Sequence, residues 1–288
     1  MKNILITAAI ACLWCCTSEK KDPHPQVKNK NVSIAYQRTG SGDTALVFVH
    51  GWCINKEYWQ AQQSYFSNRF TTVALDLGGH GESGTNRDNW TPDEYARDVV
   101  ALIKTLDLKK VILVGHSMSG AINVIAANTI PDRIVGFVGV DNFKDFVTSY
   151  TPEQQAQIDG FLDIVKKNFD TVATSYSYSS LFPPNYPDTA SMNRVIRNVQ
   201  QIDSTIAIKT IEQMIPAALK EGQQLSQLQL PLYLIVSDFG PVNDSVVTKY
   251  AKKGLIAKTI KGVGHYPMIE KPDEFNQQLQ AVVNEIAR

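Results

Sequence analysis

Short apolar runs of strand length alternate along this chain with amphipathic helical segments. The runs Ala45–His50 and Val111–Gly115 are nearly continuous in Val, Leu, Ile and Phe, which is typical of strands buried on both faces of a parallel sheet. Similar runs recur at Val32–Arg38, Thr71–Asp76, Ile134–Asp141, Leu232–Ser237 and Leu255–Ile260. The alternation predicts an α/β fold with a mostly parallel central sheet and helices on both faces.

One interval is too long for a simple crossover between neighbouring strands. From Phe143 to Gln229 no strand pattern appears, whereas a βαβ crossover needs only a few tens of residues. Thr151-Pro152-Glu153-Gln154 gives an N-cap with a proline at the first helical position. One apolar helical face follows, made of Ile158, Phe161, Leu162, Val165, Phe169 and Val172. An inserted helical cap is therefore predicted at about residues 143–229, over the carboxyl ends of the strands, where open α/β sheets bind ligands.

The first 30 residues differ in character from the rest. Residues 1–16 carry one Lys and an apolar run of secretory-signal length, too short for a permanent membrane helix. Leu13-Trp14-Cys15-Cys16 resembles the cleavage box of bacterial lipoproteins, which leaves a lipidated cysteine. Cys16 is the first choice for that residue and Cys15 the second, with a plain secretory signal as the alternative. Residues 17–30 are interpreted as a tether, so we expect an exported, membrane-anchored lipoprotein, or otherwise a periplasmic or secreted protein.

Charge and composition exclude several kinds of partner. The 288 residues hold 28 Lys and Arg against 28 Asp and Glu, and no stretch concentrates basic residues, so nucleic-acid binding is not expected. His50 and His116 lack carboxylate or thiol companions at ligand spacing, so no metal site is predicted. No cofactor is expected either. The predicted partner is a small-molecule substrate, with membrane contact only through the lipid anchor.

The strongest chemical signal is a serine at a strand-to-helix turn. Gly115-His116-Ser117-Met118-Ser119-Gly120 follows the run that starts at Val111 and precedes a helical segment. Such a turn holds the serine in a strained backbone conformation with its hydroxyl at the sheet edge. The segment resembles the Gly-x-Ser-x-Gly elbow of the α/β-hydrolase family, with Ser119 at the second glycine position. The resemblance implies that Ser117 is a nucleophile and that the hydrolase domain spans residues 31–288.

Two other segments carry the same resemblance. His50-Gly51-Trp52-Cys53 follows a strand run, as the oxyanion loop of the family does. The resemblance implies that the backbone N–H groups of Trp52 and Met118 form an oxyanion hole. Asp76-Leu77-Gly78-Gly79-His80-Gly81-Glu82-Ser83 is similar to the family's Asp-x-x-Gly-His-Gly-x-Ser turn and is interpreted as structural. His80 and His50 are disfavoured as catalytic bases.

His265 is the predicted base. It lies in Gly262-Val263-Gly264-His265-Tyr266-Pro267 after the last strand run, which resembles the family's Gly-His loop and follows the serine in the family's chain order. A histidine there can take the proton from the serine and return it to the leaving group. Two aspartates compete to orient it: Asp238, after the strand run that follows the cap, and Asp141, at the end of the run before the cap. Asp238 is preferred, with Asp141 a close second.

These motifs together favour a serine hydrolase that cleaves a carboxylic ester of a small or medium-sized substrate through an acyl-enzyme. Relatives that open epoxides or displace halide place an aspartate at the elbow, so those reactions are disfavoured here. Carbon–carbon bond hydrolases and cofactor-free perhydrolases use the same scaffold. A non-catalytic small-molecule binding module is the alternative from another class of protein.

Overall fold

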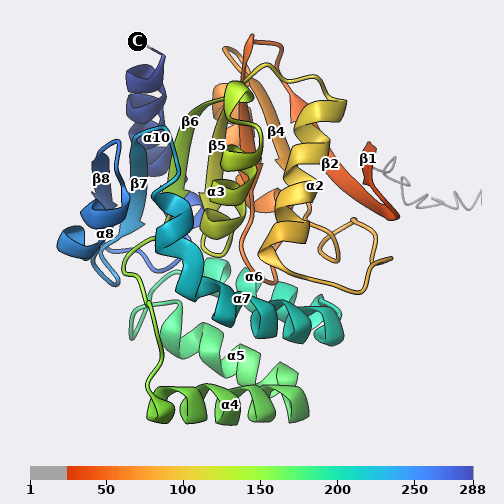
Figure 1. The fold of residues 1–288 in the computed structure, drawn as a ribbon, viewed down its shortest axis with the longest axis vertical. Coiled ribbons are helices and arrows are strands. Elements are labelled where there is room, and N and C mark those ends of the chain that lie inside the picture. Colours follow the sequence, from red (N-terminus) through yellow and green to blue (C-terminus); the bar gives the residue numbers. More distant parts are fainter. Residues whose placement is uncertain (1–24, 288) are drawn as a thin grey trace, which may run out of the picture.

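The computed structural model describes residues 25–287, which form an eight-stranded sheet flanked and capped by helices (Figure 1). The spatial order of the strands is β1-β2-β4-β3-β5-β6-β7-β8. The two antiparallel pairs are β1 with β2 and β2 with β4, and every other neighbouring pair is parallel. The strands are β1 (Gln26–Asn29), β2 (Val32–Thr39), β3 (Thr44–Val49), β4 (Thr71–Leu75), β5 (Lys110–His116), β6 (Ile134–Val140), β7 (Leu232–Ser237) and β8 (Leu255–Ile260).

The helices belong to two groups, one packed on the sheet and one inserted between β6 and β7. The first group comprises α1 (Gln60–Phe66), α2 (Pro92–Thr105), α3 (Ser119–Thr129), α8 (Asp244–Tyr250), α9 (Pro267–Glu270) and α10 (Pro272–Ile286), with the 3₁₀ turns η1 (Lys56–Trp59) and η2 (Pro131–Arg133). The second group comprises α4 (Pro152–Lys167), α5 (Phe169–Ser180), α6 (Thr189–Gln201) and α7 (Ser204–Leu225). No helix within residues 25–287 is both long and apolar enough to cross a membrane.

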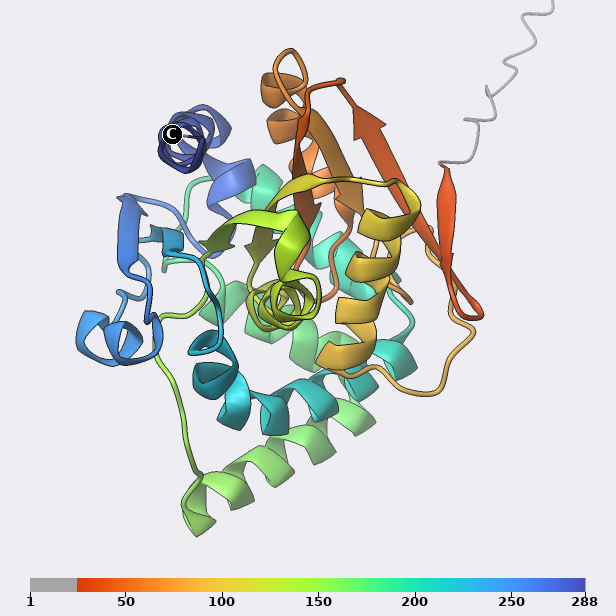
Figure 2. The ribbon, with the colours of Figure 1, turned by 45° about the horizontal axis from the view of Figure 1, so that its top comes forward.

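Alternating side chains of the central strands build a separate core on each face of the sheet. In β3, Val47 and Val49 pack with the apolar face of α2, whereas Leu46 and Phe48 pack with α10. Successive side chains of a strand point to opposite faces, so a continuous apolar run packs against helices on both faces of the sheet. Figure 2 shows α2 and α3 side by side over one face. The predicted α/β-hydrolase architecture is confirmed.

The four inserted helices gather at one end of the sheet (Figure 1). α4 begins at the N-cap that the sequence predicts, and the structure adds a capping box: the Thr151 hydroxyl accepts from the Gln154 N–H, and the Gln154 side chain accepts from the Thr151 N–H. The single apolar helical face expected from Ile158 to Val172 is divided between two helices. Asn168 ends α4 and precedes α5 with φ −144° and ψ 50°, which no α-helix accommodates.

The prediction of a tether over residues 17–30 is wrong for its last residues. Gln26–Asn29 form β1 and pair antiparallel with the start of β2. The stretch contains one apolar residue, Val27, which is buried, so it shows no strand alternation in the sequence. Residues 1–24 lie outside the described part of the chain, and the signal segment and lipidation at Cys16 or Cys15 stay predictions.

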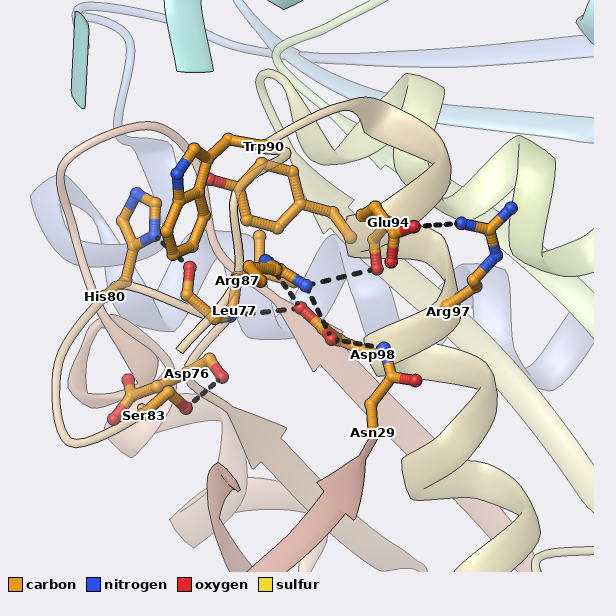
Figure 3. A network of polar contacts seen from close by, with 12 residues as sticks. Asn29, Asp76, Leu77, His80, Ser83, Arg87, Trp90, Glu94, Arg97 and Asp98 are labelled. Carbon is orange, nitrogen blue, oxygen red and sulfur yellow. Dashed lines mark hydrogen bonds and ion pairs between the residues drawn. The ribbon is translucent and has the colours of Figure 1, made fainter. Parts of the chain in front are cut away.

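Asn29 ties β1 to a buried ion pair on α2 (Figure 3). The Asp98 carboxylate is fully buried, accepts from Arg87 Nη1 at 2.9 Å and forms an ion pair with Arg87 Nη2 at 2.9 Å. It also accepts from the Asn29 amide at 2.7 Å and from the Gly78 N–H at 3.1 Å. The Arg87 guanidinium lies over the Trp90 ring, 4.7 Å from its centroid. One carboxylate therefore fastens the first strand, the helix and the turn after β4 to one another.

We predict that Asp98→Ala lowers the free energy of unfolding by about 3–5 kcal/mol, because it leaves a buried guanidinium and the Gly78 N–H without an acceptor. Urea unfolding of the variant and the wild type measures the difference. Asp93→Asn, an exposed position in the first turn of the same helix, is the control and is expected to cost less than about 1 kcal/mol. Equal losses from the two substitutions would contradict the assigned role of Asp98.

Candidate active site

Ser117 occupies a strained turn between β5 and α3. Its φ is +53°, in the left-handed region that residues with a Cβ rarely adopt. The turn is tight: a Cβ built on Gly115 would lie 2.5 Å from Asn123 Nδ2 and 2.8 Å from the Ser119 carbonyl oxygen. The buried Ser119 hydroxyl donates to the His50 carbonyl. The serine at the usual glycine position therefore connects the elbow to the end of β3.

Asn142 holds the elbow from the neighbouring strand. Its side-chain amide donates to the Gly115 carbonyl at 2.8 Å and to the Ser117 carbonyl at 3.2 Å. The Ser117 N–H in turn donates to the Val140 carbonyl at 3.0 Å. Sequence reasoning missed Asn142 as a site residue, although its position directly after the strand end at Asp141 is the available signal.

Asp141 is the carboxylate that contacts His265. Its Oδ2 lies 2.6 Å from His265 Nδ1. Its Oδ1 accepts from the Ser237 N–H and hydroxyl, both at 2.8 Å, and pairs with Lys144 Nζ at 2.8 Å. Burial alone would raise the pKa of Asp141, but the hydrogen bond and charge of His265, with Lys144, outweigh it and lower the pKa to about 2. The carboxylate is therefore ionised at neutral pH.

The structure corrects the preference for Asp238. Asp238 is exposed, and its Oδ1 accepts from the Gly262 N–H at 2.9 Å instead of contacting His265. The reason lies in the alternation of side chains at the end of β7. Ser237 points inward and bonds Asp141, so the next side chain along the chain points away from the site.

The other histidines among the described residues form hydrogen bonds with backbone groups. His50 accepts from the Leu77 N–H at 3.0 Å through Nε2, which leaves Nδ1 to donate to the Gly51 carbonyl at 2.7 Å. Burial lowers the pKa of His50 to about 4, and that of His80 and His116 to about 3 each. These rings are therefore neutral near pH 7. His265, with 18% of its side chain exposed, lines the same cavity as Ser117 and is the histidine there that contacts Asp141.

Two backbone N–H groups beside Ser117 have no acceptor within residues 25–287. They belong to Met118, the N-cap of α3, and to Trp52, in the turn after β3. The Trp52 indole is fixed separately, because its Nε1–H donates to the Ala207 carbonyl of α7 at 3.1 Å. The loop passes close to the elbow: a Cβ on Gly51 would lie 3.2 Å from Ser117 Cβ. This arrangement can stabilise negative charge on an oxygen bound near Ser117.

Ser117 and His265 open into one cavity of about 180 Å³ beneath the inserted helices. No hydrogen bond joins the two side chains within the described residues. The cavity walls hold no Lys, Arg, Asp or Glu, and consist of Trp52, His116, Ser117, Met118, Phe161, Val165, Val172, Ala173, Tyr176, Leu181, Ile211, Met214, His265 and Tyr266. α4, α5 and α7 thus supply most of an apolar wall. Residues 25–287 contain no group of three or more His, Cys, Asp or Glu side chains arranged to hold a metal ion.

Comparison with known proteins agrees with this geometry. The family described as alpha/beta hydrolase fold matches residues 44–272. A 2-(acetamidomethylene)succinate hydrolase of Mesorhizobium japonicum is 29% identical over 172 residues, 60% of this chain and 60% of that protein. A 3-oxoadipate enol-lactonase 2 of Acinetobacter baylyi is 21% identical over 88% of this chain and 94% of its own. A thermophilic esterase from Thermogutta terrifontis superposes with a TM-score of 0.78 at 19% identity, over 91% of this chain and 98% of that one.

The chain belongs to the alpha/beta hydrolase family. The family assignment made from the elbow and its companion motifs is confirmed.

The pKa of Asp141 leads to a pH-dependent contribution to stability. The folded-state pKa of about 2 lies below the ordinary 3.8, so the contribution is fully present above the unfolded-state value and is lost as the pH falls through about 2. We expect Asp141→Asn to be less stable than the wild type at about pH 6, and that deficit to shrink by about 2 kcal/mol towards about pH 2. Urea unfolding across this range measures it, and a constant deficit would contradict the assignment.

Proposed function

We propose that this protein hydrolyses carboxylic esters through an acyl-enzyme on Ser117. One observation carries the proposal: a strained serine shares an apolar cavity with a histidine whose Nδ1 lies 2.6 Å from a buried, ionised aspartate. That combination provides a nucleophile, a base and the group that orients the base. The esterase and enol-lactonase among the similar proteins, both named for ester or lactone chemistry, support it.

The proposed reaction has two halves. Ser117 Oγ attacks the ester carbonyl carbon while His265 Nε2 takes its proton, and the Trp52 and Met118 N–H groups hold the resulting oxyanion. The intermediate collapses to the acyl-enzyme when His265 returns the proton to the departing alcohol. Water then repeats the sequence and releases the acid, with His265 again as base and then acid. Asp141 keeps Nδ1 protonated and stabilises the imidazolium.

The absence of a hydrogen bond between the Ser117 and His265 side chains, among the described residues, is compatible with this mechanism. Catalytic hydrogen bonds are commonly long before substrate binds and shorten in the Michaelis complex. Carbon–carbon bond hydrolases and perhydrolases would use the same groups. A test of activity on substrates of each class therefore decides between these reactions and ester cleavage. A binding module would use the cavity without the serine.

We predict that Ser117→Ala and His265→Ala lower kcat on p-nitrophenyl acetate by about 10⁴-fold or more, and Asp141→Asn by about 10³-fold. Asp238→Asn is the matched control and stays within about twofold of the wild type, because its carboxylate contacts the Gly262 N–H alone. A fluorophosphonate adduct mapped by mass spectrometry should fall on Ser117 and vanish in His265→Ala. Folded wild-type protein with neither turnover nor adduct would support the binding module instead.

The cavity also predicts the acyl group. At about 180 Å³ it is close to cavities that hold a benzene molecule, so an acyl group of about six non-hydrogen atoms fills it. Because no cationic side chain lines it, an acyl carboxylate would be buried without a partner. We expect kcat/KM for p-nitrophenyl butyrate to exceed that for the p-nitrophenyl ester of succinate by at least about 100-fold. Comparable values for the two esters would show that the acyl group does not enter this cavity.

A further inference from the structure

His265 lies in a segment that belongs to no helix or strand. Residues 261–266 join β8 to α9, so the regular hydrogen bonds of secondary structure do not fix them. A displacement of about 1 Å in a catalytic group can cost about 100-fold in rate. The contacts that fix this loop therefore bear directly on how well His265 can act on Ser117.

Glu270 binds the two backbone N–H groups that flank His265. Its Oε2 accepts from the Gly264 N–H at 2.6 Å, and its Oε1 accepts from the Tyr266 N–H at 2.7 Å. Hydrogen bonds to an ionised acceptor are shorter and roughly twice as strong as neutral ones. Because both oxygens of one planar carboxylate are used, the chain on either side of His265 is attached to a single rigid group.

The backbone of His265 itself is fixed by two other parts of the chain. Its N–H donates to the Leu181 carbonyl at 2.8 Å. Its carbonyl accepts from His116 Nε2 at 2.8 Å, in the residue before the nucleophile. Asp141 thus holds the imidazole at Nδ1, and hydrogen bonds at both the N–H and the carbonyl hold the His265 backbone.

The segment Leu181–Tyr186, between α5 and α6, packs on the same loop. Tyr186 lies near Glu270, and burial together with that nearby carboxylate raises the pKa of the Tyr186 hydroxyl. The Phe182 ring stacks on Tyr266 with centroids 5.6 Å apart. The approach is too close for a side chain at Gly264, where a Cβ would lie 2.5 Å from the Leu181 carbonyl oxygen. This part of the cap therefore packs closely against residues 261–266.

The charge of Glu270 also acts on the imidazole. Burial raises the pKa of Glu270, opposed by the Tyr186 hydroxyl, the two N–H groups and the charge of His265. Lys271 does not neutralise this carboxylate, since its Nζ donates to the Lys261 carbonyl and pairs with Glu274. Glu270 and His265 therefore interact electrostatically as well as through the loop.

We propose that Glu270 is a positioning residue for His265 and that the cap segment Leu181–Tyr186 reinforces it through the Leu181 carbonyl and the Phe182 ring. The inference rests on the proposed function only in taking His265 as the base. Glu270 touches none of the reacting atoms and acts through the loop that it binds.

Glu270→Gln tests the kinetic consequence. The amide keeps the size of the side chain, but offers one acceptor oxygen and sets an NH₂ group against the other N–H. We expect kcat on p-nitrophenyl acetate to fall by about 10- to 100-fold with KM within about threefold. Tyr186→Phe, which removes one hydroxyl, should cause a smaller fall. The control is Glu274→Gln, an exposed glutamate 3.8 Å from Lys271, which should stay within about twofold of the wild type.

Proton NMR of the His265 Nδ1–H tests positioning without turnover. The proton between Nδ1 and Asp141 resonates far downfield, and its absence in His265→Ala assigns it. We expect the resonance to shift or broaden in folded Glu270→Gln and to be unchanged in Glu274→Gln. If the wild type cleaves no ester yet the resonance responds, the proposed function fails and the role of Glu270 stands. An unmoved resonance in folded Glu270→Gln overturns that role, whether or not kcat falls.

Discussion

The hydrogen bond between His265 Nδ1 and Asp141 Oδ2 joins parts of the chain that are 124 residues apart in sequence. Removal of a carboxylate from water is costly, and here His265, Lys144 and the Ser237 N–H and hydroxyl offset that cost. These partners come from the end of β6, the end of β7 and the loop after β8. The carboxyl edge of the sheet is thus organised around one buried charge, and the histidine is oriented as a consequence.

The elbow depends on close packing of the backbone at two glycines. Gly115 and Gly51 leave no room for a Cβ against Ser119 and His116. The Asn142 amide and the Ser119 hydroxyl donate to the Gly115 and His50 carbonyls, respectively. The strain of the left-handed Ser117 is sustained because β3, β5 and β6 all contribute to holding it.

The cap is part of the site and more than a cover. It supplies most of the apolar wall of the cavity through α4, α5 and α7, and it binds the Trp52 indole through the Ala207 carbonyl. It also contacts residues 261–266 through the Leu181 carbonyl and the Phe182 ring. If the proposed function holds, a change of cap sequence would alter acyl selectivity and the position of His265 together. The mostly apolar wall also strengthens electrostatic interactions at the reacting centre, because it keeps the effective dielectric constant low.

The sequence by itself determined the fold class, the strand runs and the elbow, because these follow from local periodicity and from turns that tolerate few residues. It also determined Ser117 and His265 as the residues brought to one cavity. Only the tertiary structure decided between Asp141 and Asp238, added β1 to the sheet and brought Asn142 and Glu270 to the site. The physical reason is that carboxylates and amides are frequent in loops, and their roles depend on which strand ends lie side by side and on which way each side chain points. Asp238 follows Ser237 directly, so its side chain points to the opposite side, away from His265. The local sequence does not show which of the two side chains points towards the site.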